Sequence, residues 1–151
     1  MGQGPDWFWD VLDATRPRLS ALEAWLQAQP RRILEEFALA YLDAAESLTD
    51  FSEGVRVDGA DWSEDSTEDL CLWVVGQGHR FWYAVITGEW ELAEAAQVYL
   101  GRPSPLSGEV IRWDQVVSDP EHRGYQSPDA IVHGVCRTRF AEDLHERLSG
   151  G

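Results

Sequence analysis

Apolar side chains recur every three or four residues along most of this chain, and prolines and glycines divide the pattern into short segments. This spacing places them on one face of an α-helix, whereas a half-buried β-strand needs them at every second position. The clearest case runs from Ile33 to Leu48, and the last runs from Ile131 to Leu148. The pattern therefore predicts a mainly α fold.

About six or seven helices are expected, in a single compact domain over residues 1–151 with frayed ends at residues 1–5 and 149–151. Asp6 is a candidate N-cap for the first helix because its carboxylate can accept a hydrogen bond from a free backbone amide. The helical pattern fails between residues 49 and 61, where alternating apolar residues between glycines allow one short extended segment. Residues 102–126 give no clear pattern.

Size and composition agree with one domain. The chain has 151 residues, 44% hydrophobic and 26% charged, close to the average globular balance. A chain of this length buries enough surface to fold without disulfides or a structural metal.

The chain is strongly acidic. Twelve arginines stand against 27 acidic residues, a formal charge of −15, and lysine and asparagine do not occur. Such a charge repels phosphates, which disfavours a nucleic-acid partner and an anionic membrane surface. It leaves a basic protein or peptide, or a small molecule, as the expected partner. Without lysine, P-loop, Schiff-base and Ser-x-x-Lys chemistries are excluded.

The two cysteines indicate the redox state of the cellular compartment in which the protein is expected. Cys71 and Cys136 lie far apart in apolar stretches, so we expect two buried free thiols, as in a reducing cytoplasm. The first residues lack the basic and apolar regions of a secretory signal, and no apolar run approaches 18 residues. A cytoplasmic protein is therefore expected.

An acidic segment, Ser63 to Asp69, precedes an apolar helical pattern. Oxygen acceptors and negative charge stabilise a helix start, which explains these residues without a ligand. The other interpretation is that Asp61, Asp65 and Glu68 share one side and hold a cation or act as an acid–base pair. The segment lacks the glycine and glutamate that a calcium loop needs at its sixth and twelfth positions.

The segments Phe8-Trp9, Ile33-Leu34-Glu35-Glu36-Phe37, Trp62-Ser63-Glu64-Asp65-Ser66 and Leu72-Trp73-Val74-Val75-Gly76-Gln77-Gly78 resemble a bacterial family of domains of unknown function, number 4240. The resemblance covers roughly residues 6–100. His79 separates Gly78 from Arg80, where the family has a direct Gly-Arg step. The family has no established activity, so the resemblance implies a small cytoplasmic bacterial protein and no reaction.

No metal or cofactor site is predicted. His133-x-x-Cys136 lacks the second ligand pair of a tetrahedral site, and Glu142-x-x-His145 lacks the partner motif of a di-iron bundle. Gly76-x-Gly78 is not a dinucleotide fingerprint, because the third glycine is missing. Burial of Cys71 would raise its pKa and make the thiol a poor nucleophile.

Tryptophan is the most unusual component. There are eight: Trp7, Trp9, Trp25, Trp62, Trp73, Trp82, Trp90 and Trp113. Some can fill the core, and others can line a surface for a flat or cationic ligand. The candidate binding residues are Trp62, Trp73, Gln77 and Arg80.

Two functions remain open. The first is an acidic helical binding module that recognises a basic protein or peptide, as a regulatory, accessory or toxin-neutralising partner. The alternative is a small accessory enzyme that acts on a peptide or metabolite of a biosynthetic pathway in a tryptophan-lined pocket, with His79 and Asp65 or Glu68 as the acid–base pair. Whether the protein is an enzyme at all is left undecided.

Overall fold

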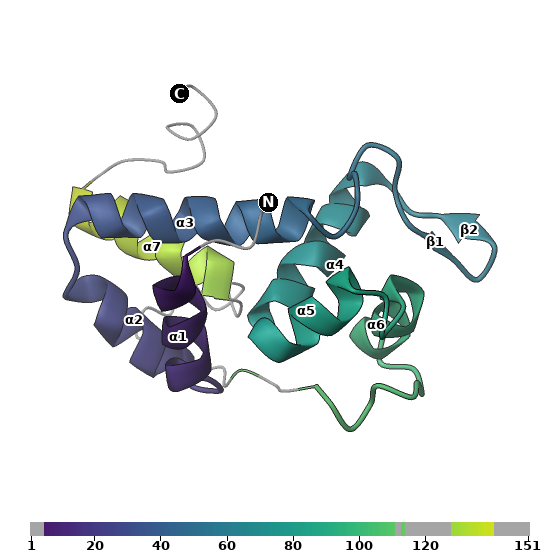
Figure 1. The fold of residues 1–151 in the computed structure, drawn as a ribbon. Coiled ribbons are helices and arrows are strands. Elements are labelled where there is room, and N and C mark those ends of the chain that lie inside the picture. Colours follow the sequence, from purple (N-terminus) through teal and green to yellow (C-terminus); the bar gives the residue numbers. More distant parts are fainter. Residues whose placement is uncertain (1–4, 111–112, 114–127, 141–151) are drawn as a thin grey trace. The chain divides into compact units, whose positions relative to one another are not determined.

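The computed structural model describes residues 5–110, 113 and 128–140. Its described part contains seven helices and one two-stranded hairpin, which confirms the predicted mainly α fold (Figure 1). The elements are α1 (Asp6–Thr15), α2 (Leu19–Gln27), α3 (Arg31–Glu46), β1 (Arg56–Val57), β2 (Ala60–Asp61), α4 (Glu64–Gly76), α5 (His79–Ile86), α6 (Leu92–Tyr99) and α7 (Pro128–Phe140).

The chain divides into two compact units. Unit 1 contains the described residues 42–110, and unit 2 contains residues 5–41, 113 and 128–140. The division falls within α3, whose residues up to Tyr41 belong to unit 2 and whose last turn belongs to unit 1. The single domain stays a prediction.

Unit 2 has an aromatic core between α1 and α3. Phe8, Phe37 and Tyr41 are buried, with the Phe8 ring 5.0 Å from Phe37 and 5.8 Å from Tyr41, edge to face in both cases. Such edge-to-face pairs add stabilisation beyond their buried area. Helix α7 packs on α2, and Arg139 donates hydrogen bonds to the carbonyl oxygens of Leu26 (3.1 Å) and Gln29. These bonds join α7 to the end of α2 and to the turn that follows it.

The cap predicted for the first helix is wrong by one residue. Pro5 is the N-cap, in an extended conformation, and Asp6 is the first helical residue. Proline has no side-chain acceptor, so this helix start has no side-chain cap. Asp6 still lies in the first turn, where the helix dipole favours negative charge.

Unit 1 begins with the last turn of α3 and a hairpin. The strands pair antiparallel, with Val57 opposite Ala60, in the region where the sequence allowed an extended segment. Gly54 precedes the hairpin with a φ of +75°, and a Cβ there would lie 2.5 Å from the carbonyl oxygen of Trp62. This close approach of two backbones requires glycine and fixes the backbone at Trp62, directly before α4.

Three short helices complete unit 1. Helix α4 packs against α5 and α6. Gly78, the N-cap of α5 with a φ of 102°, separates α4 from α5. The indole Nε1 of Trp82 in α5 donates a buried 2.8 Å hydrogen bond to the carbonyl oxygen of Ala44. That carbonyl is in the last turn of α3, so α5 supplies the partner that this helix end lacks.

The tryptophans divide between core and surface. Trp9 and Trp82 are buried, and the other six are half-buried. Cys71 and Cys136 are buried free thiols, as predicted. In the described part of the chain no helix is both long and apolar enough to cross a membrane.

Several predicted features lie outside the described residues. They are the last helix beyond Phe140, the Glu142-x-x-His145 motif, and residues 1–4 and 149–151.

Candidate functional site

The acidic segment before the fourth helix is a helix start, as its first interpretation predicts. Ser63 is the N-cap of α4, and its Oγ accepts a 3.2 Å hydrogen bond from the backbone amide of Ser66. Glu64 and Asp65 lie in the first turn, where the free amides favour negative charge. This cap fixes the residues that follow, including the side of α4 that faces α6.

One side of α4 carries Ser66, Asp69 and Trp73, at spacings of three and four residues, and Trp62 lies two residues before the helix begins. Positions so spaced lie one above another on a helix. Tyr99, the last residue of α6, packs against both tryptophans, with ring centroids 6.4 Å from Trp62 and 5.6 Å from Trp73. The end of α6 therefore closes over this side of α4.

A pocket of about 400 Å³ lies where these two helices meet. Its lining residues are Trp62, Ser66, Asp69, Tyr99, Leu100 and Arg102. The side chains of Tyr99 and Leu100 are 39% and 44% exposed, so the pocket opens to solvent. Its volume is within the range of small-ligand sites, about 300–1,000 Å³. We call it the Trp62–Tyr99 pocket.

Asp69 provides the negative charge of the pocket. Burial raises the pKa of the Tyr99 hydroxyl, and the carboxylate of Asp69 raises it further. The second effect has the expected direction, because negative charge disfavours the tyrosinate, and Asp69 and Tyr99 line the same pocket. Tyr99 therefore stays a neutral hydroxyl at physiological pH and presents an uncharged aromatic ring beside an acid.

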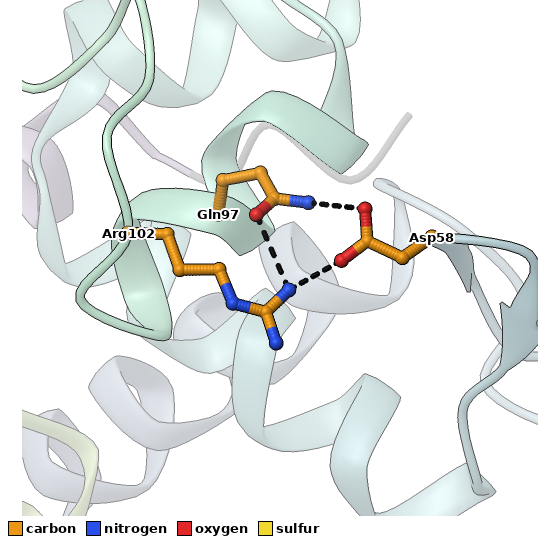
Figure 2. Close-up of polar contacts among 3 residues, drawn as sticks. All are labelled: Asp58, Gln97 and Arg102. Atoms are coloured by element: carbon orange, nitrogen blue, oxygen red, sulfur yellow. Dashed lines mark hydrogen bonds and ion pairs between the residues drawn. The ribbon is translucent and has the colours of Figure 1, made fainter.

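A second charged group, Arg102, lines the pocket from the loop after α6. Its Nη1 donates to the carboxylate of Asp58 and to Oε1 of Gln97, at 3.4 Å for the latter (Figure 2). The amide nitrogen of Gln97 donates a 3.0 Å hydrogen bond to the other carboxylate oxygen of Asp58. This Asp58–Gln97–Arg102 network joins the hairpin turn to the end of α6.

The structure places two of the predicted binding residues together. Trp62 lines the pocket, and Trp73 supports it from behind Tyr99 without lining it. Asp65 is exposed in the first turn of α4, and Glu68 is half-buried one turn later beside Cys71. Neither carboxylate lines the pocket.

The other predicted residues lie at the opposite end of α4. Gln77 is its buried C-cap, and His79 begins α5, where its ring stacks on Tyr83 at 5.7 Å. The Arg80 guanidinium lies over the ring of Trp90 at 5.4 Å. Asp65 and the last residue of α4 are eleven positions apart, roughly 16 Å along the helix axis at 1.5 Å per residue. The structure therefore does not bring Asp65 and His79 together along this helix.

Five residues that line the pocket were not predicted from the sequence: Ser66, Asp69, Tyr99, Leu100 and Arg102. Ser66 and Asp69 could have been found by counting helical turns back from Trp73, which they precede by seven and four residues. The other three depend on how α6 packs on α4, for which the sequence carries no direct signal.

Two kinds of chemistry have no support in unit 1. Burial raises the pKa of the Cys71 thiol to about 12, and the nearby Glu68 carboxylate adds to the effect, so the thiol is a poor nucleophile. Within residues 5–110, 113 and 128–140, no three His, Cys, Asp or Glu side chains are grouped as metal ligands.

Comparisons with known proteins add no relative. The chain matches no family model, no curated protein and no solved structure. The resemblance to family 4240 stays a prediction, and the function has to be argued from the site alone.

Proposed function

We propose that this protein is a binding module that recognises a basic protein or peptide through the Trp62–Tyr99 pocket. The observation that carries the proposal is the pocket itself, in which the rings of Trp62 and Tyr99 stand beside the carboxylate of Asp69. Aromatic faces and a carboxylate both attract a cation, and the aromatic surface also contributes apolar contact.

The charge of unit 1 supports a basic partner. Residues 42–110 contain three arginines and fourteen acidic residues, a formal charge of −11 out of −15 for the whole chain. Two of the three, Arg56 and Arg102, already pair with Asp61 and Asp58. The acidic surface around the pocket therefore accelerates the approach of a cationic partner and repels an anionic one.

The enzymatic alternative gains no support from the same pocket. None of His79, Asp65 and Glu68, the expected acid–base residues, lines it. A general acid or base has to come within hydrogen-bond reach of the reacting group, directly or through one water. The geometry therefore favours binding over catalysis at this site.

The test uses two blocked octapeptides, acetyl-(Arg-Gly)4-amide and acetyl-(Gln-Gly)4-amide, titrated into the full chain by calorimetry. We expect the arginine peptide to bind and the glutamine peptide not to bind. The affinity should fall at least fivefold between 50 and 300 mM salt, because exposed charges are screened over about 10 Å at 0.1 M ionic strength. Trp62→Phe, which keeps an aromatic ring of smaller area, should weaken binding.

A matched control separates the pocket from the overall charge. Glu89→Gln removes one exposed carboxylate of unit 1 that does not line the pocket, and it should leave the affinity within twofold. Failure of the arginine peptide to bind, or binding that salt does not weaken, would contradict the proposed function.

A further inference from the structure

The two charged groups of the Trp62–Tyr99 pocket, Arg102 and Asp69, differ in whether an oppositely charged neighbour pairs with them. The charge of Arg102 is balanced by Asp58, within the Asp58–Gln97–Arg102 network. The side-chain carboxylate of Asp69 forms no hydrogen bond or ion pair with any residue in the described part of the chain. The pocket therefore presents one uncompensated negative charge, although its lining contains one acid and one base.

The surroundings of that charge suit a single cation. Trp62 and Tyr99 offer aromatic surface, and Leu100 offers apolar surface for the aliphatic part of a long side chain. An anion would meet Asp69 without a free cation to balance it. A lysine or arginine side chain matches all of these groups at once.

Resting on the proposed function, we propose that the pocket binds one lysine or arginine side chain of the partner, with Asp69 as its counter-ion. We further infer that Asp58 and Gln97 are positioning residues, which hold Arg102 away from Asp69. The shared chemistry is a long aliphatic side chain that ends in an ammonium or a guanidinium group.

The network geometry explains the second inference. Each carboxylate oxygen of Asp58 has its own partner, Gln97 on one and Arg102 on the other, while Gln97 also accepts from Arg102 (Figure 2). Three mutual bonds restrain a long arginine side chain better than the single pair would. Asp58 is at the hairpin turn with a φ of 54°, so the turn conformation presents its carboxylate to α6.

Replacement of Asp58 should therefore weaken ligand binding although Asp58 does not line the pocket. Arg102 would keep its positive charge on the pocket wall, where it repels a bound cation and competes for Asp69. A second substitution that removes the charge of Arg102 should restore binding. This rescue is a result that a merely structural role of Asp58 would not produce.

The experiment uses three blocked tripeptides, acetyl-Gly-Arg-Gly-amide, acetyl-Gly-Lys-Gly-amide and acetyl-Gly-Gln-Gly-amide. Binding is followed by nuclear magnetic resonance of the tryptophan indole N–H groups, with the Trp62 signal assigned by Trp62→Phe. We expect the arginine and lysine peptides to shift the Trp62 signal and the glutamine peptide to leave it unchanged. The ratio of the two affinities decides between guanidinium and ammonium as the preferred group.

Four variants test the roles. Asp69→Asn should lower the affinity at least fivefold, and Asp58→Asn should lower it about threefold. The double variant Asp58→Asn/Arg102→Gln should return it to within twofold of the wild type, and Glu89→Gln should leave it unchanged. Circular dichroism confirms the fold of each variant, and Asp69→Ser serves as a second variant at that position.

The outcomes separate this inference from the proposed function. If the arginine octapeptide binds the wild type and Asp69→Asn equally well, the protein still binds basic peptides but the pocket does not take the cation. If Asp58→Asn binds as the wild type does, or if the double variant is not rescued, the positioning role is overturned. If no basic peptide binds the wild type, the proposed function itself fails.

Discussion

Gly54 is the residue with the least freedom to change in unit 1. Alanine there would need a positive φ, and its Cβ would lie 2.5 Å from the carbonyl oxygen of Trp62, a backbone atom. We expect Gly54→Ala to lower the free energy of unfolding by about 1–3 kcal/mol, as for other strained backbone positions. Urea denaturation followed by tryptophan fluorescence measures the change.

Gly59→Ala is the matched control. Gly59 has a similar φ of +79°, but nothing lies within 4 Å of its would-be Cβ. Gly59→Ala therefore has only the cost of a positive φ, without a clash. It should lower the free energy of unfolding by less than Gly54→Ala does. Equal losses at the two positions would show that contact with the Trp62 carbonyl does not matter.

Cys71 makes stability depend on pH above neutrality. Burial, and secondarily Glu68, raise the pKa of its thiol from 9.0 to about 12. The folded chain therefore keeps a proton that the unfolded chain releases, so this contribution is full below pH 9 and is lost as the pH rises towards 12. One such proton corresponds to about 1.4 kcal/mol per pH unit.

Cys71→Ala should remove this part of the pH dependence. Between pH 9 and 10.5 the free energy of unfolding of the wild type should fall more steeply than that of the variant, by up to about 2 kcal/mol over the interval. Urea midpoints at several pH values measure both slopes. The buried Tyr41, whose pKa burial also raises, contributes to both proteins and cancels in the difference. Parallel slopes would rule out the shifted thiol.

At the scale of the element, the start of α4 depends on one hydroxyl. Ser63→Ala removes the acceptor for the Ser66 amide and should lower the free energy of unfolding by about 0.5–2 kcal/mol. Ser63→Asp keeps an acceptor and adds a charge that the helix dipole favours, so it should stay near the wild type. Thermal denaturation by circular dichroism compares the three proteins. A Ser63→Asp variant as unstable as Ser63→Ala would argue against capping.

The two helix starts show how much the sequence can predict. Ser63 was predictable because an acceptor, two acids and an apolar pattern follow one another within a few residues. Asp6 was predicted as a cap by the same rule and is not one, because Pro5 already adopts the extended conformation of the N-cap position. Local rules thus predict that a helix begins, and they are less reliable for the residue at which it begins.

The candidate site was harder to predict than the helices. Trp62, a half-buried residue that lines the pocket, was already among the candidate binding residues, because it stands beside the acidic segment. Tyr99 and Arg102 come from a segment more than thirty residues later in the sequence. Their place in the pocket depends on α6 packing on α4, a tertiary contact that helical spacing alone does not specify.

At the scale of the whole molecule, the prediction of a single domain implies that the two units unfold together. Helix α3 contributes Phe37 and Tyr41 to the core of unit 2 and Ala44 and Ala45 to that of unit 1. Helices form cooperatively, and loss of either core would leave part of α3 without its packing. We therefore expect both units to unfold in one transition, as chains of about 150 residues commonly do.

Two tryptophans report on the units separately. The indole N–H of Trp25 reports on unit 2 and that of Trp73 on unit 1, and each signal is followed through a urea titration by nuclear magnetic resonance. In the wild type the two midpoints should coincide. In Gly54→Ala, a change confined to unit 1, both should move to lower urea by the same amount, because a single transition has a single free energy. A shift of the Trp73 midpoint with that of Trp25 unchanged would mean that the units are independent domains, in which case α3 frays at its end without unfolding the core around Phe37.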